Sequence, residues 1–233
     1  MNDAAKTVVI YTGTRAPKPA PEALDIRHLP MLQIEPLQVS DDRLSELFDE
    51  SAGMVVYSQN AIRCIRLSGA QKHIAPFDRH VWWSVGEKTA DAIHREFGVR
   101  AHVPSVHNFE GLKSEMSSAE LPDRVISLSL YGKSRDLSPI LAPRHIDFVD
   151  LPIYRTVPTR YDALSSRIGD ADWVVFTSPR GVQTFVEQSA EEIRDLLRSL
   201  STAAIGPKTA AAMQERDIEV DFVPDTPDTD AIF

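Results

Sequence analysis

The sequence is poor in the features that mark several large classes of protein. It has one cysteine, Cys64, in 233 residues, which excludes a disulfide framework and any cysteine-rich metal site. No apolar run approaches the roughly 18 residues that a membrane span needs. The first six residues contain no apolar stretch of the kind found in signal peptides. These absences predict a reduced, cytoplasmic protein without a membrane partner.

Positive charge is also scarce. The chain has 25 Lys and Arg against 34 Asp and Glu, a formal net charge of −9. Nucleic-acid-binding proteins carry a basic excess, so we expect no nucleic-acid partner. An anionic ligand would have to be held by backbone N–H groups and a few well-placed cations, because the field of the whole protein is unfavourable. The acidic charge and the lack of a long apolar run also favour a monomer.

Familiar catalytic and nucleotide-binding motifs are missing as well. The sequence contains no Gly-x-Gly-x-x-Gly, no complete P-loop and no Gly-x-Ser-x-Gly elbow. The seven histidines are scattered, and His102 and His107 have no third ligand near them. Cys64 lies on an apolar helical face, which favours a buried, inert thiol. We therefore predict no metal, no cofactor and no covalent catalysis.

Short apolar runs rich in β-branched residues alternate with helix-period segments along the chain. Continuous apolar strands separated by helices predict parallel sheets that are covered on both faces, which is an α/β fold. Helices are expected at 44–49 and 87–97. The strands are expected at 7–11, 53–57, 80–84, 99–103, 125–130, 171–176 and 202–205.

Two parts of the sequence resemble each other. Residues 55–62 parallel 174–182, and residues 85–90 parallel 205–210, with nearly the same spacing. We therefore predict two similar parallel-sheet α/β domains. The opening strand lacks its own copy of the repeat, so we expect that strand and a following helix to complete the C-terminal domain.

This arrangement predicts one discontinuous domain and one inserted domain. Residues 1–35 and 156–233 would form the first, and residues 36–155 the second. The Pro-rich stretch 17–36 and the extended segment 151–158 are then the two crossings, because proline limits helix formation and favours extended chain. We place the crossings near 34–38 and 151–158, and expect them to form a two-stranded hinge with a cleft between the domains.

Polar turns follow the predicted strands. Ligands of open α/β sheets bind beyond the carboxyl ends of the strands, where helix N-termini offer free N–H groups and partial positive charge. Several such turns suit a ligand with several acid groups. The serines and threonines in them could instead only cap helices, and the glycines could only form tight turns. The turns lie at 58–60, 86–89, 131–136, 178–181 and 206–209.

Taken together, five short segments resemble the uroporphyrinogen-III synthase family. They are Val-Val-Phe-Thr-Ser-Pro-Arg-Gly-Val at 174–182, Ala-Ile-Gly-Pro-Lys-Thr-Ala at 204–210, Gly-Lys-Ser-Arg at 132–135, Tyr-Arg-Thr at 154–156, and Thr-Arg at 14–15. The likeness runs from about Val8 to Asp230. It implies two α/β domains of the flavodoxin-like type joined by a two-stranded ladder. It also implies closure of the linear tetrapyrrole hydroxymethylbilane to uroporphyrinogen III without cofactor or metal.

The resemblance assigns roles to single residues. Tyr154 lies on a predicted crossing and matches the family's tyrosine, so it is the expected catalytic group, although a tyrosine there could also serve only to fill space between domains. An alternative function is a two-lobed, hinged binding or sensor module for a small polyanion, without catalysis. The residues expected to bind substrate carboxylates are Thr14, Arg15, Ser58, Thr89, Gly132, Arg135, Ser178, Gly206 and Thr209.

Overall fold

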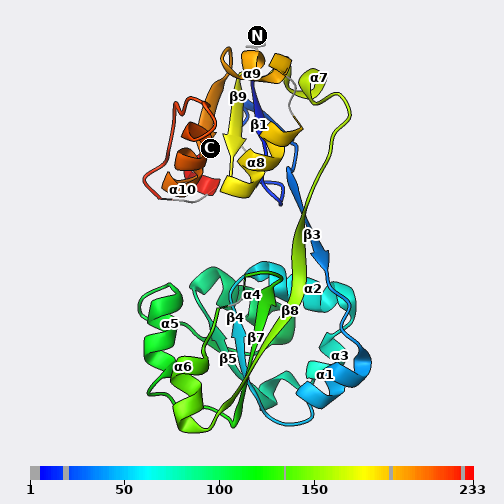
Figure 1. The fold of residues 1–233 in the computed structure, drawn as a ribbon, viewed down its shortest axis with the longest axis vertical. Coiled ribbons are helices and arrows are strands. Elements are labelled where there is room, and N and C mark those ends of the chain that lie inside the picture. Colours follow the sequence, from blue (N-terminus) through cyan, green and yellow to red (C-terminus); the bar gives the residue numbers. More distant parts are fainter. Residues whose placement is uncertain (1–5, 18–20, 134, 189–190, 227–228) are drawn as a thin grey trace. The chain divides into compact units, whose positions relative to one another are not determined.

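The computed structural model describes residues 6–17, 21–133, 135–188, 191–226 and 229–233 (Figure 1). The chain divides into two compact units. Unit 1 comprises Met1–Gln33 and Val157–Phe233, and unit 2 comprises Ile34–Thr156. None of the helices in the described ranges combines the length and apolar character that crossing a lipid bilayer requires.

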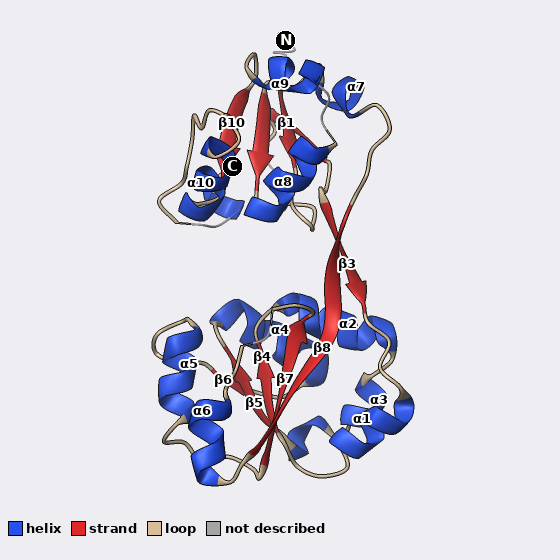
Figure 2. Ribbon diagram, in the orientation of Figure 1, coloured by secondary structure: helices blue, strands red, loops and turns tan. Residues whose placement is uncertain are grey.

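Unit 1 is built on a four-stranded sheet with the strand order β10-β9-β1-β2 (Figure 2). Neighbouring strands pair in parallel throughout this sheet. The strands are β1 (Thr7–Tyr11), β2 (Leu24–His28), β9 (Trp173–Phe176) and β10 (Ser201–Ala204). The helices are α7 (Leu164–Ile168), α8 (Pro179–Glu187), α9 (Glu191–Leu197) and α10 (Pro207–Gln214).

Both faces of the sheet in unit 1 are covered by apolar side chains. On one face, Ile10 and Phe176 belong to a buried cluster that includes Phe185 of α8. On the other face, Val9 and its neighbours pack against the last residues of the chain, including Phe233. Successive strand residues point to opposite faces, so a strand covered on both sides must be apolar throughout, as β1 is.

The segment after β1 differs from our prediction. We expected a helix after the first strand, but this part of the chain, as far as it is described, forms β2, which pairs with β1 from Thr7↔Leu24 to Tyr11↔His28. The physical reason lies in the sequence of β2, where Leu24 and Ile26 alternate with charged residues. Such alternation is typical of an edge strand with one covered face. The expected crossing is therefore shorter than the whole stretch 17–36.

Unit 2 contains a six-stranded sheet with the order β3-β8-β7-β4-β5-β6. The pairings from β8 through β6 are parallel. The strands are β3 (Leu32–Pro36), β4 (Gly53–Val56), β5 (Val81–Ser84), β6 (Ala101–His102), β7 (Arg124–Leu130) and β8 (Asp147–Pro158). The helices are α1 (Asp41–Leu47), α2 (Gln59–Ser68), α3 (Gln71–Ile74), α4 (Glu87–Phe97), α5 (Phe109–Met116) and α6 (Ser138–Leu141).

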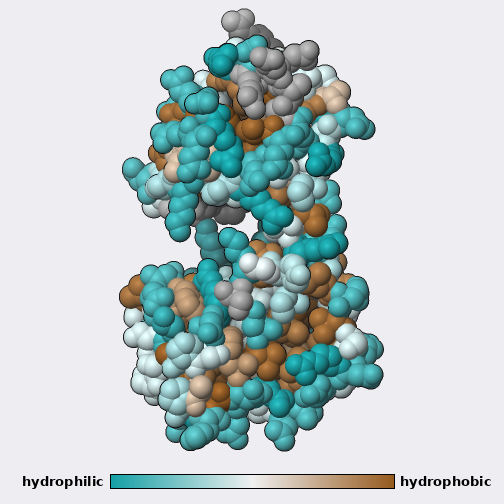
Figure 3. Space-filling model, in the orientation of Figure 1, coloured by the Kyte–Doolittle hydropathy of each residue, from teal (hydrophilic) through white to brown (hydrophobic). Residues whose placement is uncertain are grey.

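Unit 2 has an apolar cluster on each face of its sheet. One cluster joins Met54 of β4 to buried residues of α1, α2 and α4, and the other joins Val55 to Leu112 and Met116 of α5. All four residues of β4 are buried, because this strand lies inside the sheet. Parallel sheets with both faces covered confirm the predicted α/β class. On the viewed surface of each unit, hydrophilic side chains predominate, with smaller apolar patches between them (Figure 3).

Two strands carry the chain from one unit to the other. The boundary between units falls within β3, after Gln33, and within β8, after Thr156. The two strands are neighbours in the sheet of unit 2, and the Leu37 N–H donates to the Ile153 carbonyl oxygen at 2.9 Å. Their action as a hinge stays a prediction.

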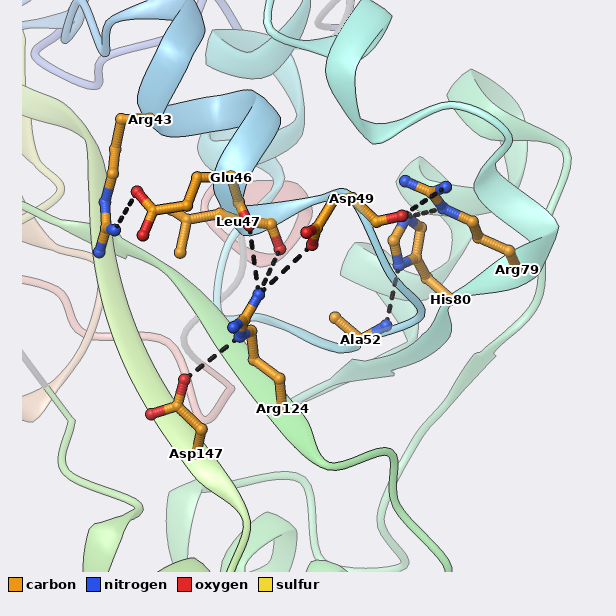
Figure 4. A network of polar contacts seen from close by, with 9 residues as sticks. All are labelled: Arg43, Glu46, Leu47, Asp49, Ala52, Arg79, His80, Arg124 and Asp147. Carbon is orange, nitrogen blue, oxygen red and sulfur yellow. Dashed lines mark hydrogen bonds and ion pairs between the residues drawn. The ribbon is translucent and has the colours of Figure 1, made fainter.

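A polar network holds α1 at the amino end of β7 (Figure 4). The Arg124 guanidinium donates to the Asp147 carboxylate at 3.2 Å and lies 3.6 Å from the Asp49 carboxylate. It also donates to the carbonyl oxygens of Glu46 and Leu47, at 3.3 and 3.5 Å. These carbonyls end a helix and lack helical partners, so the arginine satisfies them. The network is structural and lies at the end of β7 opposite to the predicted binding turns.

Figure 4 also shows a buried histidine beside this network. His80 is 5% exposed; its Nδ1 accepts the Ala52 N–H at 3.1 Å, and its Nε2 lies 2.9 Å from the Ile74 carbonyl oxygen. Because a carbonyl can only accept, Nε2 carries the proton and the ring is neutral. Burial lowers the pKa of His80, and the nearby Arg79 cation adds to this, while the two backbone contacts oppose it.

Candidate carboxylate-binding edges

In unit 2, the predicted site residues gather at one edge of the sheet. β7, β4 and β5 are parallel neighbours, so their carboxyl ends share this edge. β8 reaches the same edge, because Tyr154 pairs with Leu130, the last residue of β7. The structure therefore places at this edge five residues from four separate segments of the chain, namely Ser58, Thr89, Gly132, Arg135 and Tyr154.

Ser58 and Thr89 differ in their local geometry. The Ser58 Oγ caps α2 by accepting the Asn60 N–H at 3.1 Å. α4 is instead capped by Gly86, whose backbone carbonyl accepts the Thr89 N–H at 3.0 Å, and Thr89 is 8% exposed. Ser58 therefore caps its helix, as the capping alternative states, whereas Thr89 does not cap α4. A capping serine accepts through its oxygen, so its own O–H is left to donate to a ligand.

The turn after β7 is tight and leads into only one helical turn. Gly132 has a φ of 74°, in the left-handed region that glycine adopts without steric cost. The Lys133 N–H donates to the Leu130 carbonyl oxygen at 2.9 Å. We expected this turn to open a helix like the others, but α6 has only four residues, and Pro143 follows it closely. Ser134, part of the predicted Gly-Lys-Ser-Arg segment, lies outside the described residues.

Arg135 is exposed and lies over two aromatic rings. Its guanidinium carbon is 5.0 Å from the centroid of the Tyr57 ring and 5.5 Å from that of Phe109. The two rings meet edge to face, with centroids 6.1 Å apart. Our sequence analysis did not single out either aromatic residue. Tyr57 directly precedes Ser58 at the end of a predicted strand, and this position could have marked it as a residue of the site. Nothing in the sequence around Phe109 indicates that it lies near the site.

Tyr154 is 6% exposed and belongs to the apolar cluster that covers the α2 side of the sheet. The register between β7 and β8 shifts between Ser129 and Leu130, so that Tyr154, not Ile153, pairs with Leu130. Such a bulge redirects the side chain that follows it. Paired residues of neighbouring strands point to the same face, so the bulge places the tyrosine on the face of Leu130, beside the carboxyl edge. Tyr154 thus lies beside the carboxyl edge with little of its surface exposed to solvent.

In unit 1, the carboxyl ends of β1, β9 and β10 share an edge in the same way. The Ser178 Oγ caps α8 by accepting the Gly181 N–H at 3.1 Å. α10 is capped by Gly206, and Thr209, in its first turn, is 3% exposed. A capping serine after one strand and a buried threonine after the next thus recur in both units. The predicted residues at this edge are Thr14, Arg15, Ser178, Gly206 and Thr209.

The chain before Thr14 and Arg15 is held firmly. The Thr12 hydroxyl donates to the Val175 carbonyl oxygen at 2.8 Å. The Gly13 carbonyl oxygen lies 2.6 Å from His28 Nε2, and a Cβ on Gly13 would lie 2.5 Å from the Tyr11 ring. A Cβ at position 13 would therefore require the Tyr11 ring to move. Thr14 is half-buried and Arg15 is exposed, and both follow a fixed backbone at the end of β1.

The two edges are suited to anions. Four helices of eight or more residues begin there, α2 and α4 in unit 2 and α8 and α10 in unit 1. Each helix N-terminus offers unpaired N–H groups and about half a positive charge. Within the described ranges, no three His, Cys, Asp or Glu side chains form a group that could hold a metal ion. The arrangement can bind carboxylates through N–H groups, hydroxyls and single arginines.

Fold and site define a class: α/β proteins of two similar units, whose strand-to-helix turns carry groups of hydrogen-bond donors. A family model described as uroporphyrinogen-III synthase HemD matches residues 24–233. The chain therefore belongs to the uroporphyrinogen-III synthase family, as its five sequence segments predicted.

Individual relatives agree with this assignment. A putative uroporphyrinogen-III synthase of Archaeoglobus fulgidus is 26% identical over 174 residues, which are 72% of this chain and 71% of the relative. The crystal structure of uroporphyrinogen-III synthetase from Helicobacter pylori 26695 matches with a TM-score of 0.67 and 16% identity, over 97% of this chain and 95% of that one. A mutant uroporphyrinogen III synthase from Thermus thermophilus matches with a TM-score of 0.54 and 22% identity, over 93% and 92%. At these identities the structural likeness establishes the fold.

Proposed function

We propose that the protein closes hydroxymethylbilane to uroporphyrinogen III, with inversion of the last pyrrole ring and release of water. Family membership carries this proposal, since it makes the protein a lyase of tetrapyrrole biosynthesis. The duplicated edges support it, because a flexible polyacid needs several separate groups that bind carboxylates.

Carboxylate binding rests on three kinds of donor. Ser58 and Ser178 keep a hydroxyl proton after capping their helices, and the buried Thr89 and Thr209 lie in the first turns of α4 and α10. Backbone N–H groups at Gly132 and Gly206 add neutral donors. Arg15 and Arg135 add charge, and Thr14 a further hydroxyl. Because the net charge is −9, these local donors must outweigh an unfavourable overall field.

Tyr154 is the proposed catalytic group. Its hydroxyl would donate a proton to the departing hydroxyl group of the bilane, which leaves as water and generates an azafulvene. The substituted carbon of the last ring then attacks, giving a spiro intermediate that fragments and recloses inverted. The small exposed fraction of Tyr154 suits a role that one hydroxyl at the end of a buried ring can perform.

Positioning supplies most of the proposed rate enhancement. The bilane closes unaided to the uninverted isomer, so the enzyme must mainly hold the reacting ends in the geometry that leads to inversion. Fixing two reacting groups in this way contributes roughly 7–11 kcal/mol. Donors at several strand ends can therefore matter more than the acid itself.

The test is direct. The protein is incubated with freshly made hydroxymethylbilane, the products are oxidised, and the two porphyrin isomers are separated by chromatography. Excess type III isomer over the spontaneous reaction is expected. Formation of type I alone, at the uncatalysed rate, contradicts the proposal; binding of the bilane in that case would favour the sensor alternative.

We also propose that the protein acts as a monomer in the cytoplasm. The net charge of −9 supports this, because like-charged copies repel one another. Light scattering on purified protein measures the first property, and cell fractionation the second. A dimer mass in dilute solution, or recovery with membranes, contradicts it.

A further inference from the structure

The strongest unexplained feature of unit 2 is the pair of rings beneath Arg135. Arginine binds aromatic faces through its charge and its flat, weakly hydrated guanidinium. The distances of 5.0 and 5.5 Å to Tyr57 and Phe109 are within the roughly 6 Å over which this attraction acts. We call the three residues Arg135, Tyr57 and Phe109 the arginine clamp.

The Tyr57 ring of the clamp is itself held. Its hydroxyl donates to the Arg135 backbone carbonyl oxygen at 3.5 Å and lies close to the Ser127 side chain. Ser127 Oγ in turn donates to an Asp150 carboxylate oxygen at 2.5 Å. Burial raises the pKa of Tyr57, and the Asp150 carboxylate adds to the rise, so the phenol stays neutral. Side chains of β7 and β8 thus surround the hydroxyl of this ring.

The chain on the far side of Arg135 is anchored too. The Asp136 carboxylate accepts the Ser138 N–H at 2.8 Å, and Leu137 is fully buried in the cluster that contains Leu112. Arg135 is nevertheless exposed, and no carboxylate among the described residues forms an ion pair with it. Its guanidinium is therefore held in place by rings, which leave its N–H groups available for an anion.

We propose that Tyr57 and Phe109 are positioning residues, which hold the Arg135 guanidinium at the carboxyl edge of β4 and β7 ready for one substrate carboxylate. This inference rests on the proposed function. Without the rings, the arginine would sample many rotamers, and binding would have to order it. The rings act on binding and not on the chemical step, so their loss affects KM and leaves kcat nearly unchanged.

A double-mutant cycle tests the clamp. We expect Arg135→Gln, Tyr57→Leu and Phe109→Leu each to raise KM for hydroxymethylbilane roughly three- to tenfold, the range that losing such a contact gives. In the Arg135→Gln background, Tyr57→Leu should change KM less than twofold further. An equal factor in both backgrounds overturns the proposal, as does an unchanged KM in Arg135→Gln.

Two further variants separate the ring from its surroundings. Tyr57→Phe keeps the ring and should keep KM near the wild-type value; a rise as large as that of Tyr57→Leu means that the hydroxyl matters and the clamp does not. Lys113 is the matched control, because its Nζ lies 5.4 Å from the Phe109 centroid while it pairs with Glu110 at 2.8 Å. Lys113→Gln should leave KM unchanged, and an effect equal to Arg135→Gln overturns the proposal.

A binding assay keeps this test separate from that of the activity. Affinity for uroporphyrin III, an oxidised product, is measured by quenching of tryptophan fluorescence in every variant, and each thermal midpoint is recorded. The clamp predicts the same non-additive pattern in affinity as in KM. If the wild-type protein forms no type III isomer, the proposed function is wrong. The affinities of the single and double variants for uroporphyrin III still show whether Tyr57 and Phe109 act through Arg135.

Discussion

The hydroxyl groups at the strand ends differ in whether they cap a helix. Ser58 and Ser178 accept helix N–H groups, whereas Thr89 and Thr209 are buried and make no capping bond. Removing a threonine hydroxyl therefore leaves the helix start intact. This difference makes the threonines the cleaner positions at which to test carboxylate binding.

We expect Thr89→Val and Thr209→Val each to lower kcat/KM about tenfold, because each variant loses one hydrogen bond to a charged group. Steady-state kinetics with hydroxymethylbilane measures the effect. Thr184→Val is the control, since Thr184 is a 5% exposed threonine within α8 and away from the carboxyl edge. Equal losses in all three variants would point to a general disturbance of the fold.

Tyr154→Phe tests the proposed acid. We expect kcat to fall at least about tenfold, with a smaller excess of the type III isomer, because no group then donates a proton to the departing hydroxyl. Tyr161→Phe is the matched control: Tyr161 is part-buried and its hydroxyl donates to the Pro30 carbonyl oxygen at 2.9 Å. The control should cost about 1 kcal/mol of stability and leave turnover intact. Unchanged turnover and isomer ratio in Tyr154→Phe remove the catalytic role.

At the scale of helices and strands, most of the strands could be predicted from local patterns. α4 spans the predicted 87–97, and β4, β7 and β9 lie within a residue or two of their predicted ends. Two of the misses lie at sheet edges. β2 alternates apolar and charged residues and was not recognised, and only Ala101–His102 of the predicted 99–103 pair with β5. β2 has no fully buried residue and β6 is only two residues long, so both give a weak apolar signal.

Part of the candidate site could also be predicted from local sequence, and part could not. Ser58 and Ser178, like Thr89 and Thr209, come from segments that repeat in sequence, so a local pattern finds them. The contact of Arg135 with Tyr57 and Phe109 depends on β7 lying beside β4 and on which face α5 covers. Strand order arises from long-range pairing, so a single sequence does not reveal it.

The free energy of unfolding of unit 2 should depend on pH through His80, whose ring contacts Ala52 and Ile74. The folded state holds the imidazole neutral and lowers its pKa, whereas the unfolded chain has the ordinary value of about 6.5. The stability from this group is present above about pH 6.5 and is lost as the pH falls from there through the folded-state pKa.

Urea unfolding between pH 8 and 5 measures this effect. We expect the midpoint of the wild-type protein to fall towards pH 5, and that of His80→Gln to start lower and to change less. His94→Gln is the control, because His94 is exposed on α4 and should leave the pH dependence as it is. A His80→Gln profile parallel to the wild-type one contradicts the assignment.

For the whole molecule, each unit has its own apolar clusters and its own sheet. A substitution that unfolds one unit should therefore leave the other unit folded. Tryptophan fluorescence can follow the units separately, because Trp82 and Trp83 lie in unit 2 and Trp173 lies in unit 1.

We expect Phe185→Ala to destabilise unit 1 by about 3–5 kcal/mol, because it opens a cavity in a fully buried site. In a Trp173→Phe background, fluorescence reports unit 2 alone, and its urea midpoint should not move. Far-UV circular dichroism of the same protein should show two separate transitions. A shift of the fluorescence midpoint equal to that seen by circular dichroism means that the units unfold as one.

The crossing of the chain at β3 and β8 has a consequence for synthesis on the ribosome. β1 and β2 emerge first, but β1 needs β9, which is made only after the whole of unit 2. About 145 residues separate β2 from β9, so at 5–20 residues per second that wait lasts roughly 7–30 seconds. The middle of the chain can thus complete its fold while the first two strands remain without their third partner, reversing the usual order in which the beginning of a nascent protein folds first.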